Sequence, residues 1–203
     1  VEVRGDYAYC SFLNGLVILD VSKSDDPRKV SQLFLGGGFG LDVAGGKAYI
    51  ASGRRGLHIV DVSDPMSPFV LGVLETPGAA KDIVVTGDRA YLAIGDAGLA
   101  TVDVADPASP SLVGSVDTPG YAESLALMDS LVYLADGAAG LQVADVGGSG
   151  DPVLIGALDT PGTAEDVTVS GNHVYVADGS AGLQVIHVGN PSSPSLETTY
   201  ATA

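Results

Sequence analysis

Residues 83–120, IVVTGDRAYLAIGDAGLATVDVADPASPSLVGSVDTPG, decide the fold of this chain. They contain four short apolar runs, and each run ends in a cluster of Gly, Asp, Pro or Ser. Runs of this length and composition are typical of β-strands joined by tight turns. Helical spacing of apolar residues does not extend over a useful length. The stretch therefore predicts four short antiparallel strands.

The same unit occurs five times along the 203 residues. A tyrosine in the second strand recurs at steps of 40 to 42 residues, at Tyr9, Tyr49, Tyr91, Tyr133 and Tyr175. A Gly-Leu pair that opens the third strand recurs with it, at Gly15, Gly56, Gly98, Gly140 and Gly182. A period of 40 to 45 residues with four strands per unit is typical of β-propeller blades.

We therefore predict an all-β protein, a β-propeller of five four-stranded antiparallel blades in one domain over residues 1–203. The approximate blades are 1–40, 41–81, 82–123, 124–165 and 166–203. The repeat does not decide between a closed five-bladed ring and a segment of a larger propeller. We expect the repeated tyrosine to fill the wedge between blades while its hydroxyl finds a partner. Cys10 stands where other copies have Ile, Leu or Val, so we expect a small buried hydrophobe.

Two strings carry a resemblance to a known family. Gly56–Pro65 and Gly98–Pro107 resemble the LVIVD repeat of bacterial and archaeal surface or secreted proteins, and so does the Thr-Pro-Gly-x-Ala-x-Asp block at Thr76–Asp82 and Thr160–Asp166. The first copy departs from the block at Leu35–Gly38. The resemblance implies a β-propeller in an extracellular or cell-surface setting, and it brings no catalytic residues to transfer.

The charge of the chain is unevenly distributed. The formal net charge is −16, all nine basic residues lie between Arg4 and Arg89, and residues 90–203 carry 14 acids without a base. Such a surface repels phosphate backbones, so we expect no nucleic-acid partner. Cations or a basic surface are the compatible ligands, although solubility in a salty medium explains the charge equally well.

No apolar run approaches 18 residues, so we expect no membrane insertion. The sequence begins with Val1 rather than methionine, from which we expect a processed or excised segment.

Strand order places possible ligand-binding residues on one face. In a four-stranded blade, the turns between the second and third strands share a face with the connections between blades. This places four acids near the mouth of the channel, namely Asp82, Glu123, Glu165 and Asp166. A ring of carboxylates suits Ca²⁺, the one candidate cofactor. The alternative is that the aspartates cap the start of the innermost strand through its backbone N–H groups. The sequence leaves the metal question open.

Catalytic constellations are absent from the sequence. The histidines His58, His173 and His187 do not show zinc spacing, and no G-x-S-x-G string is present. We name no catalytic residue and expect a non-catalytic module that acts by protein–protein contact. A cation-dependent ligand-binding module or an enzyme at the acidic channel mouth is the alternative.

Arg54 and Arg55 are the candidate interaction residues. They occupy the turn in which other copies carry Asp96-Ala97, Ala138-Ala139 and Ser180-Ala181. Docking of this basic turn on the acidic blades of another copy would be a heterologous contact. Apolar neighbours such as Phe39 or Phe69 would have to supply much of the affinity. We therefore expect a protein partner or self-association.

Overall fold

The computed structural model describes residues 1–202 and consists of five antiparallel sheets of four strands each. Blade 1 holds β1 (Glu2–Arg4), β2 (Tyr7–Phe12), β3 (Gly15–Asp20) and β4 (Arg28–Phe34). Blade 2 holds β5 (Leu41–Ala44), β6 (Lys47–Ala51), β7 (Leu57–Asp61) and β8 (Phe69–Leu74). Blade 3 holds β9 (Asp82–Thr86), β10 (Arg89–Ala93), β11 (Leu99–Asp103) and β12 (Ser111–Val116).

The last two blades repeat this pattern. Blade 4 holds β13 (Ser124–Met128), β14 (Leu131–Ala135), β15 (Leu141–Asp145) and β16 (Val153–Leu158). Blade 5 holds β17 (Asp166–Ser170), β18 (His173–Ala177), β19 (Leu183–His187) and β20 (Ser195–Tyr200), with a short 3₁₀ turn η1 (Gly179–Ala181) before β19. In every blade the strands pair in chain order. The predicted five blades of four antiparallel strands are therefore confirmed.

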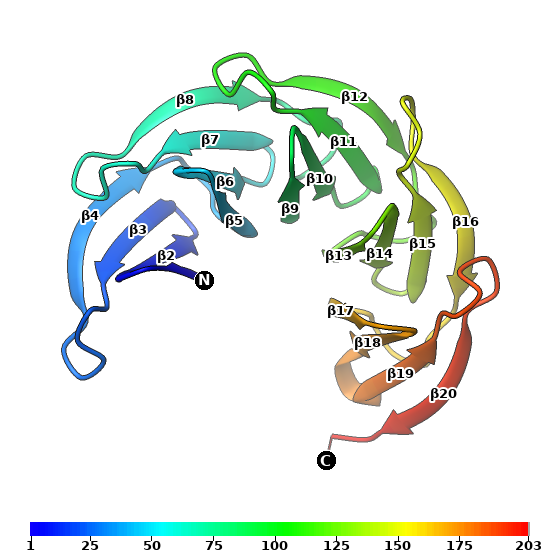
Figure 1. Ribbon diagram of the computed structural model, residues 1–203. Coiled ribbons are helices and arrows are strands. Elements are labelled where there is room, and N and C mark those ends of the chain that lie inside the picture. Colours follow the sequence, from blue (N-terminus) through cyan, green and yellow to red (C-terminus); the bar gives the residue numbers. More distant parts are fainter. Residues whose placement is uncertain (203) are drawn as a thin grey trace.

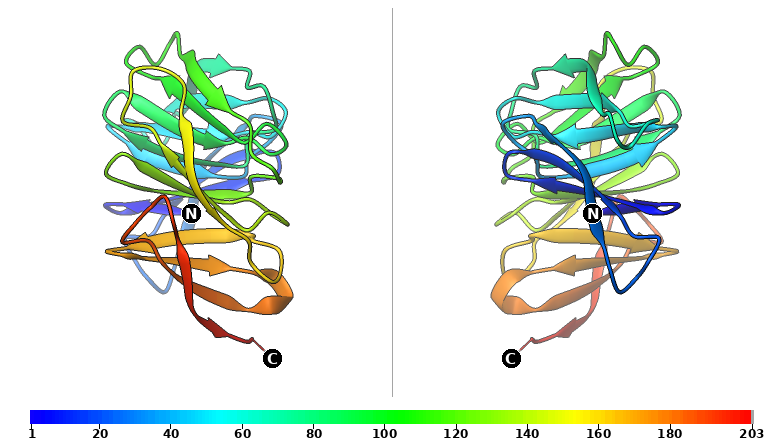
Figure 2. Two further views of the ribbon diagram at one scale, coloured as in Figure 1. Left: turned by 90° about the vertical axis from the view of Figure 1, so that its right-hand side faces the viewer. Right: turned by 90° about the vertical axis from the view of Figure 1, so that its left-hand side faces the viewer.

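The blades stand side by side around an axis and form an open arc (Figure 1). The first strand of each blade lies at the inner edge of the arc and the fourth strand at the outer edge. Seen from the sides, most strands run along the axis, so the turns gather at two opposite faces (Figure 2). Each sheet pairs only within its own blade, and no sheet hydrogen bonds within residues 1–202 close the ring. Of the two forms left open above, the structure shows the arc.

The core lies between the blades. At the junction of blades 2 and 3, Tyr49 and Leu57 of one blade pack with Leu92 and Val102 of the next. The other three junctions use the equivalent residues. Because each strand contributes one face to each neighbouring blade, nearly every residue of the middle strands β10, β11, β14 and β15 is buried. Each extra junction thus buries a new layer of apolar side chains.

The tyrosine layer forms as predicted, with one difference. The rings of Tyr9, Tyr49, Tyr91 and Tyr133 are all buried, and Tyr133 is 0% exposed. The Oη of Tyr133, however, makes no hydrogen bond within residues 1–202. The expectation that each hydroxyl finds a partner therefore fails at this position. The ring fills the wedge between blades 4 and 5, where it packs among apolar side chains.

The Gly-Leu pair has a steric cause. Gly56 has a φ of +73°, a backbone conformation that residues with a side chain rarely adopt. A Cβ at this position would also lie 2.1 Å from the carbonyl oxygen of Leu74, on the neighbouring strand β8. Glycine is therefore needed where the turn enters β7, and the following Leu57 is then placed fully in the core.

Candidate functional site

The turns and blade connections named above do share one face, which we call the turn face. At three junctions, a glycine of the turn between the second and third strands pairs with an alanine of the next blade connection. The pairs are Gly53 with Ala80, Gly95 with Ala122 and Gly137 with Ala164. These bridges fix the turns of one blade against the connection that leads into the next, so the turn face is a rigid surface.

Asp82 lies at the start of the innermost strand β9 and is held by hydrogen bonds from its own and the next blade. The N–H of Ile83 donates to Oδ1 at 2.9 Å, and the N–H of Leu125 in blade 4 donates to Oδ2 at 3.0 Å. Burial raises the pKa of the Asp82 carboxyl and outweighs these backbone hydrogen bonds, which act in the opposite direction. Asp82 thus caps a strand, as in the alternative considered above.

Ser124 links Asp82 to Asp166. Its Oγ lies 2.9 Å from Oδ2 of Asp82 and 2.8 Å from Oδ1 of Asp166. Asp166 also accepts the N–H of Val167 at 2.9 Å. Three equivalent positions of blades 3, 4 and 5 therefore form one row of hydrogen bonds along the inner edge of the arc. Burial is the main cause of the raised pKa of Asp82; the charge of Asp166 in this row also raises it, whereas the hydrogen bond from Ser124 lowers it.

The two glutamates of the predicted ligand ring make other contacts than the residues of this row. Glu123 forms an ion pair with Lys81, with 3.0 Å between Oε2 and Nζ. Glu165 is exposed and lines a depression at the free edge of blade 5, together with Gly179 and Leu183. Among residues 1–202, no group of three or more His, Cys, Asp or Glu side chains is arranged to hold a metal ion.

Two other aspartates of the turn face point inward. Asp136 and Asp178 are 0% exposed. Each accepts a threonine hydroxyl at 2.6 Å, from Thr118 and Thr160 respectively. Each also accepts a glycine N–H at 2.9 Å, two residues after that threonine. The carboxylates therefore hold the Thr-Pro-Gly turn of the preceding connection, and they are part of the fold rather than of a ligand site.

Basic and aromatic side chains gather on the turn face over blades 2 and 3. Lys81 lies between two aromatic rings, with Nζ 5.3 Å from the centroid of Phe39 and 5.0 Å from that of Tyr121. Burial alone would lower the pKa of Lys81, but the hydrogen bond and charge of Glu123 together raise it. The lysine is therefore a fixed cation at this face.

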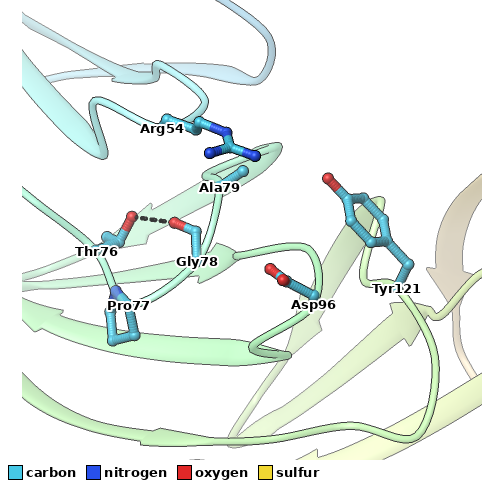
Figure 3. Close-up of a pocket in the computed structure, with 7 residues that line it drawn as sticks. All are labelled: Arg54, Thr76, Pro77, Gly78, Ala79, Asp96 and Tyr121. Carbon is cyan, nitrogen blue, oxygen red and sulfur yellow. Dashed lines mark hydrogen bonds between the residues drawn. The ribbon is translucent and has the colours of Figure 1, made fainter.

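Arg54 and Arg55 border the same place. Arg54, Asp96 and Tyr121 line a depression of about 340 Å³, into which all three polar ends point (Figure 3). Both arginines also line an adjoining depression of about 370 Å³. We call the set Phe39, Arg54, Arg55, Lys81 and Tyr121 the basic–aromatic patch. Apart from Lys81, its members are all exposed.

The patch was only partly predictable. The sequence indicates the two arginines and Phe39. Phe69, the other apolar neighbour considered, lies in β8 at the outer edge of the arc and is not part of the patch. Tyr121 was missed, although the sequence carries a signal. The residue after Thr-Pro-Gly is Ala79 and Thr163 in other copies, so an aromatic residue stands out at this position.

A pair of histidines was also missed. His173 and His187 face each other on paired strands of blade 5, with ring centroids 5.5 Å apart. His173 Nε2 lies 2.8 Å from a carboxylate oxygen of Glu197. Spacing along the chain did not reveal the pair, because the contact depends on the register of β18 against β19.

No helix within residues 1–202 has the length and apolar character needed to span a membrane.

Comparison with known proteins agrees with the architecture. No curated protein sequence matches the chain. A solved structure, the crystal structure of the computationally designed Ika8 protein, is similar in fold, with a TM-score of 0.74 and 8% sequence identity. The similarity covers 93% of this chain and 57% of that one, so this chain spans little more than half of its length.

A family model matches nearly the whole chain. The LVIVD repeat is found at residues 1–30, 38–76, 77–118, 119–160 and 161–202. Each match covers most or all of one blade, and together they account for all five sheets. The chain therefore belongs to the LVIVD repeat family.

Proposed function

We propose that the chain is a non-catalytic, extracellular or cell-surface module that acts by protein–protein contact through the basic–aromatic patch. The observation that carries this proposal is the gathering of Arg54, Arg55 and Lys81 beside exposed aromatic rings, in a chain of net charge −16. Three of the nine bases thus lie on one small, rigid part of the surface.

The chemistry of the patch favours an acidic protein segment. Arginine binds carboxylates with two parallel hydrogen bonds, and aromatic rings supply rigid apolar contact area. Lys81 is already paired with Glu123, so the arginines are the donors that an incoming carboxylate would meet. The depression beside Arg54 has room for one side chain, with Tyr121 as a further hydrogen-bonding group. The acidic blades 3 to 5 of a second copy are one such partner.

A cation-dependent ligand site or an active site at Asp82, Glu123, Glu165 and Asp166 has less support. Asp82 and Asp166 already accept backbone N–H groups, and Glu123 is paired with Lys81. The extracellular or cell-surface location is supported by the resemblance to surface and secreted proteins, and fractionation of producing cells tests it.

Selection from a random peptide library displayed on phage tests the proposal. Peptides selected on the wild-type chain should be rich in Asp and Glu. Their affinity should fall at least about tenfold for Arg54→Glu/Arg55→Glu, because two charge-assisted contacts become repulsive. Arg28→Glu/Lys29→Glu is the matched control, since it changes the net charge equally on exposed residues of β4. Equal losses in both variants, or peptides without acidic residues, would argue against the patch.

Self-association is measured separately by light scattering at low and high salt. If a second copy is the partner, the assembly should weaken with salt and with Arg54→Glu/Arg55→Glu. A chain that stays monomeric at high concentration and low salt removes this form of the contact and leaves the acidic-peptide test unaffected.

A further inference from the structure

The far face of blade 5 exposes residues that are buried at every other blade. Leu16, Leu57, Leu99 and Leu141 are all 0% exposed, whereas their equivalent Leu183 is partly exposed. Tyr175 is likewise partly exposed, in contrast to the four other tyrosines of the layer. Ala177 is exposed, although Ala51, Ala93 and Ala135 are 0% exposed. Blade 5 thus presents an apolar blade face that lacks a neighbour within residues 1–202.

The outward face of blade 1 is the other half of such a junction. Cys10 is partly exposed, so the expectation of a buried hydrophobe is wrong at this position, and Leu19 is partly exposed as well. Their equivalents in the later blades are 0% exposed, namely Ile50, Leu92, Leu134 and Val176 for the first, and Val60, Val102, Ala144 and Ile186 for the second. Val3 is 55% exposed, whereas Val43 at the same position of blade 2 is 5% exposed. Both ends of the arc therefore carry the residues of an internal junction without the partner blade.

Polar groups at the free edge of blade 5 also lack the partners that their equivalents have. Gly53, Gly95 and Gly137 each bridge to the next blade connection, but Gly179 has no such bridge within residues 1–202. Oδ2 of Asp82 accepts an N–H from the next blade, whereas Oδ2 of Asp166 accepts no hydrogen bond within the same range. Gly179 and the carboxylate of Asp166 are therefore both in position to bond with one more blade.

The outer strand β20 of blade 5 differs from β8, β12 and β16 at two positions where those strands share one kind of residue, and at the first of them Glu197 stands in place of Leu71, Val113 and Ile155. Thr198 stands where Gly72, Gly114 and Gly156 contact the following blade. Blade 1 shows that a hydroxyl is compatible with this contact, because Ser31 at the same position donates to the carbonyl of Pro65 in blade 2 at 2.6 Å.

The number of blades that the opening of the arc can hold is inferred from the fold comparison. The aligned part is 93% of this chain and 57% of the designed chain, so the designed chain is about 1.6 times as long as this one. That length corresponds to about eight blades of the size seen here. Eight blades lie within the usual range of propellers. The opening of the arc (Figure 1) then has room for about three blades. A second copy brings five, which is more than the opening holds.

We propose that the opening is filled by three further blades of the LVIVD repeat, which pack on the free faces of blades 5 and 1. The added segment presents Leu and Val side chains to Tyr175 and Leu183, and a tyrosine–leucine face to Cys10 and Leu19. This inference concerns the two ends of the arc and stands apart from the interaction role proposed above.

An extended chain tests the proposal. Residues 78–203 are appended once more after Ala203, which adds three blades and keeps the register, because Thr202 then takes the place of Thr76, two residues before Gly78. Cys10 is the only cysteine and lies on the free face of blade 1, so its rate of reaction with a soluble disulfide reagent reports whether that face is covered. We expect the thiol to react at least about tenfold more slowly than in the wild type, with a higher unfolding temperature.

Two variants of the appended segment make the result specific. Val185→Glu in the appended copy places a charge on the face that meets blade 1 and should restore fast reaction of Cys10. Leu112→Glu is the matched control, since Leu112 is 42% exposed and lies on an outer strand. Equal Cys10 reactivity in the extended and wild-type chains overturns the proposal. So does slow Cys10 reaction in a self-associated wild type, because a second copy would then be the occupant.

Discussion

Replacing the repeated tyrosine by alanine in two different blades measures how much one blade junction contributes to the free energy of unfolding. Tyr133 is fully buried between blades 4 and 5, while Tyr175 at the same position of blade 5 faces the opening of the arc. Tyr133→Ala should cost about 3–5 kcal/mol of unfolding free energy, the usual range for a core aromatic side chain. Tyr175→Ala loses a ring that is already partly in solvent, and we expect about 1 kcal/mol.

Tyr133→Phe separates the ring from its hydroxyl. A buried polar group without a partner costs about 1–3 kcal/mol, and Oη of Tyr133 has no hydrogen bond within residues 1–202. The phenylalanine variant should therefore equal the wild type in stability or exceed it by about 1 kcal/mol.

Urea unfolding followed by far-ultraviolet circular dichroism measures all three variants. The slope of the transition serves as the control, because a changed slope would mean that blades unfold separately rather than that a junction is weaker. Equal midpoints for Tyr133→Ala and Tyr175→Ala would refute the assignment of this layer to the blade junctions. A clear loss in Tyr133→Phe would show that the hydroxyl is bonded.

Three further variants test separate parts of the structure. Asp82→Ala removes the acceptor of the Ile83 and Leu125 N–H groups and should cost about 1–3 kcal/mol, whereas Glu165→Ala on the exposed edge should cost well under 1 kcal/mol. Thermal melts compare the two, and equal melting temperatures would mean that Asp82 does not hold the blades together. Burial raises the pKa of Asp136, so the folded chain binds a proton there more tightly than the unfolded chain does. The stability advantage of wild type over Asp136→Asn should therefore grow as pH falls from neutral through the raised pKa, and should level off near the ordinary value of about 3.9. Urea unfolding at several pH values across this range measures the stability difference between the two chains, and a difference that does not change with pH contradicts the prediction. Gly56→Ala should cost more than about 2 kcal/mol because its Cβ would meet the carbonyl of Leu74, while Gly87→Ala has similar φ but open space and should cost about 1 kcal/mol. Calorimetry compares the stability of the two variants, and equal losses would mean that the backbone angle φ alone sets the cost of the alanine.

The sequence predicted the strands well because every signal occurs five times. The tyrosine, the Gly-Leu pair and the Thr-Pro-Gly turn mark the same places in each copy, so an ambiguous copy is corrected by the others. The openness of the arc was not predictable from any residue. It depends on the angle between neighbouring blades added over four junctions, and no single side chain sets that angle.

The candidate site was less predictable than the fold. Strand order alone places the turns that contain Asp136 and Asp178 on the turn face, but it does not give the inward direction of their side chains. The threonine 18 residues before each of them is the signal that was available, because it supplies the hydroxyl partner. The contact of Lys81 with Phe39 and Tyr121 joins three successive blade connections, and only the packing of blades brings them together.

The equivalence of the four junctions has a genetic consequence. Tyr91, Tyr133 and Tyr175 are spaced by 42 residues, so recombination between these copies of the coding sequence adds or removes a whole blade in frame. The blades that become neighbours meet through the same tyrosine–leucine face, and no new contact has to evolve. The length of the array can therefore change between related genes while the local packing of each blade stays the same.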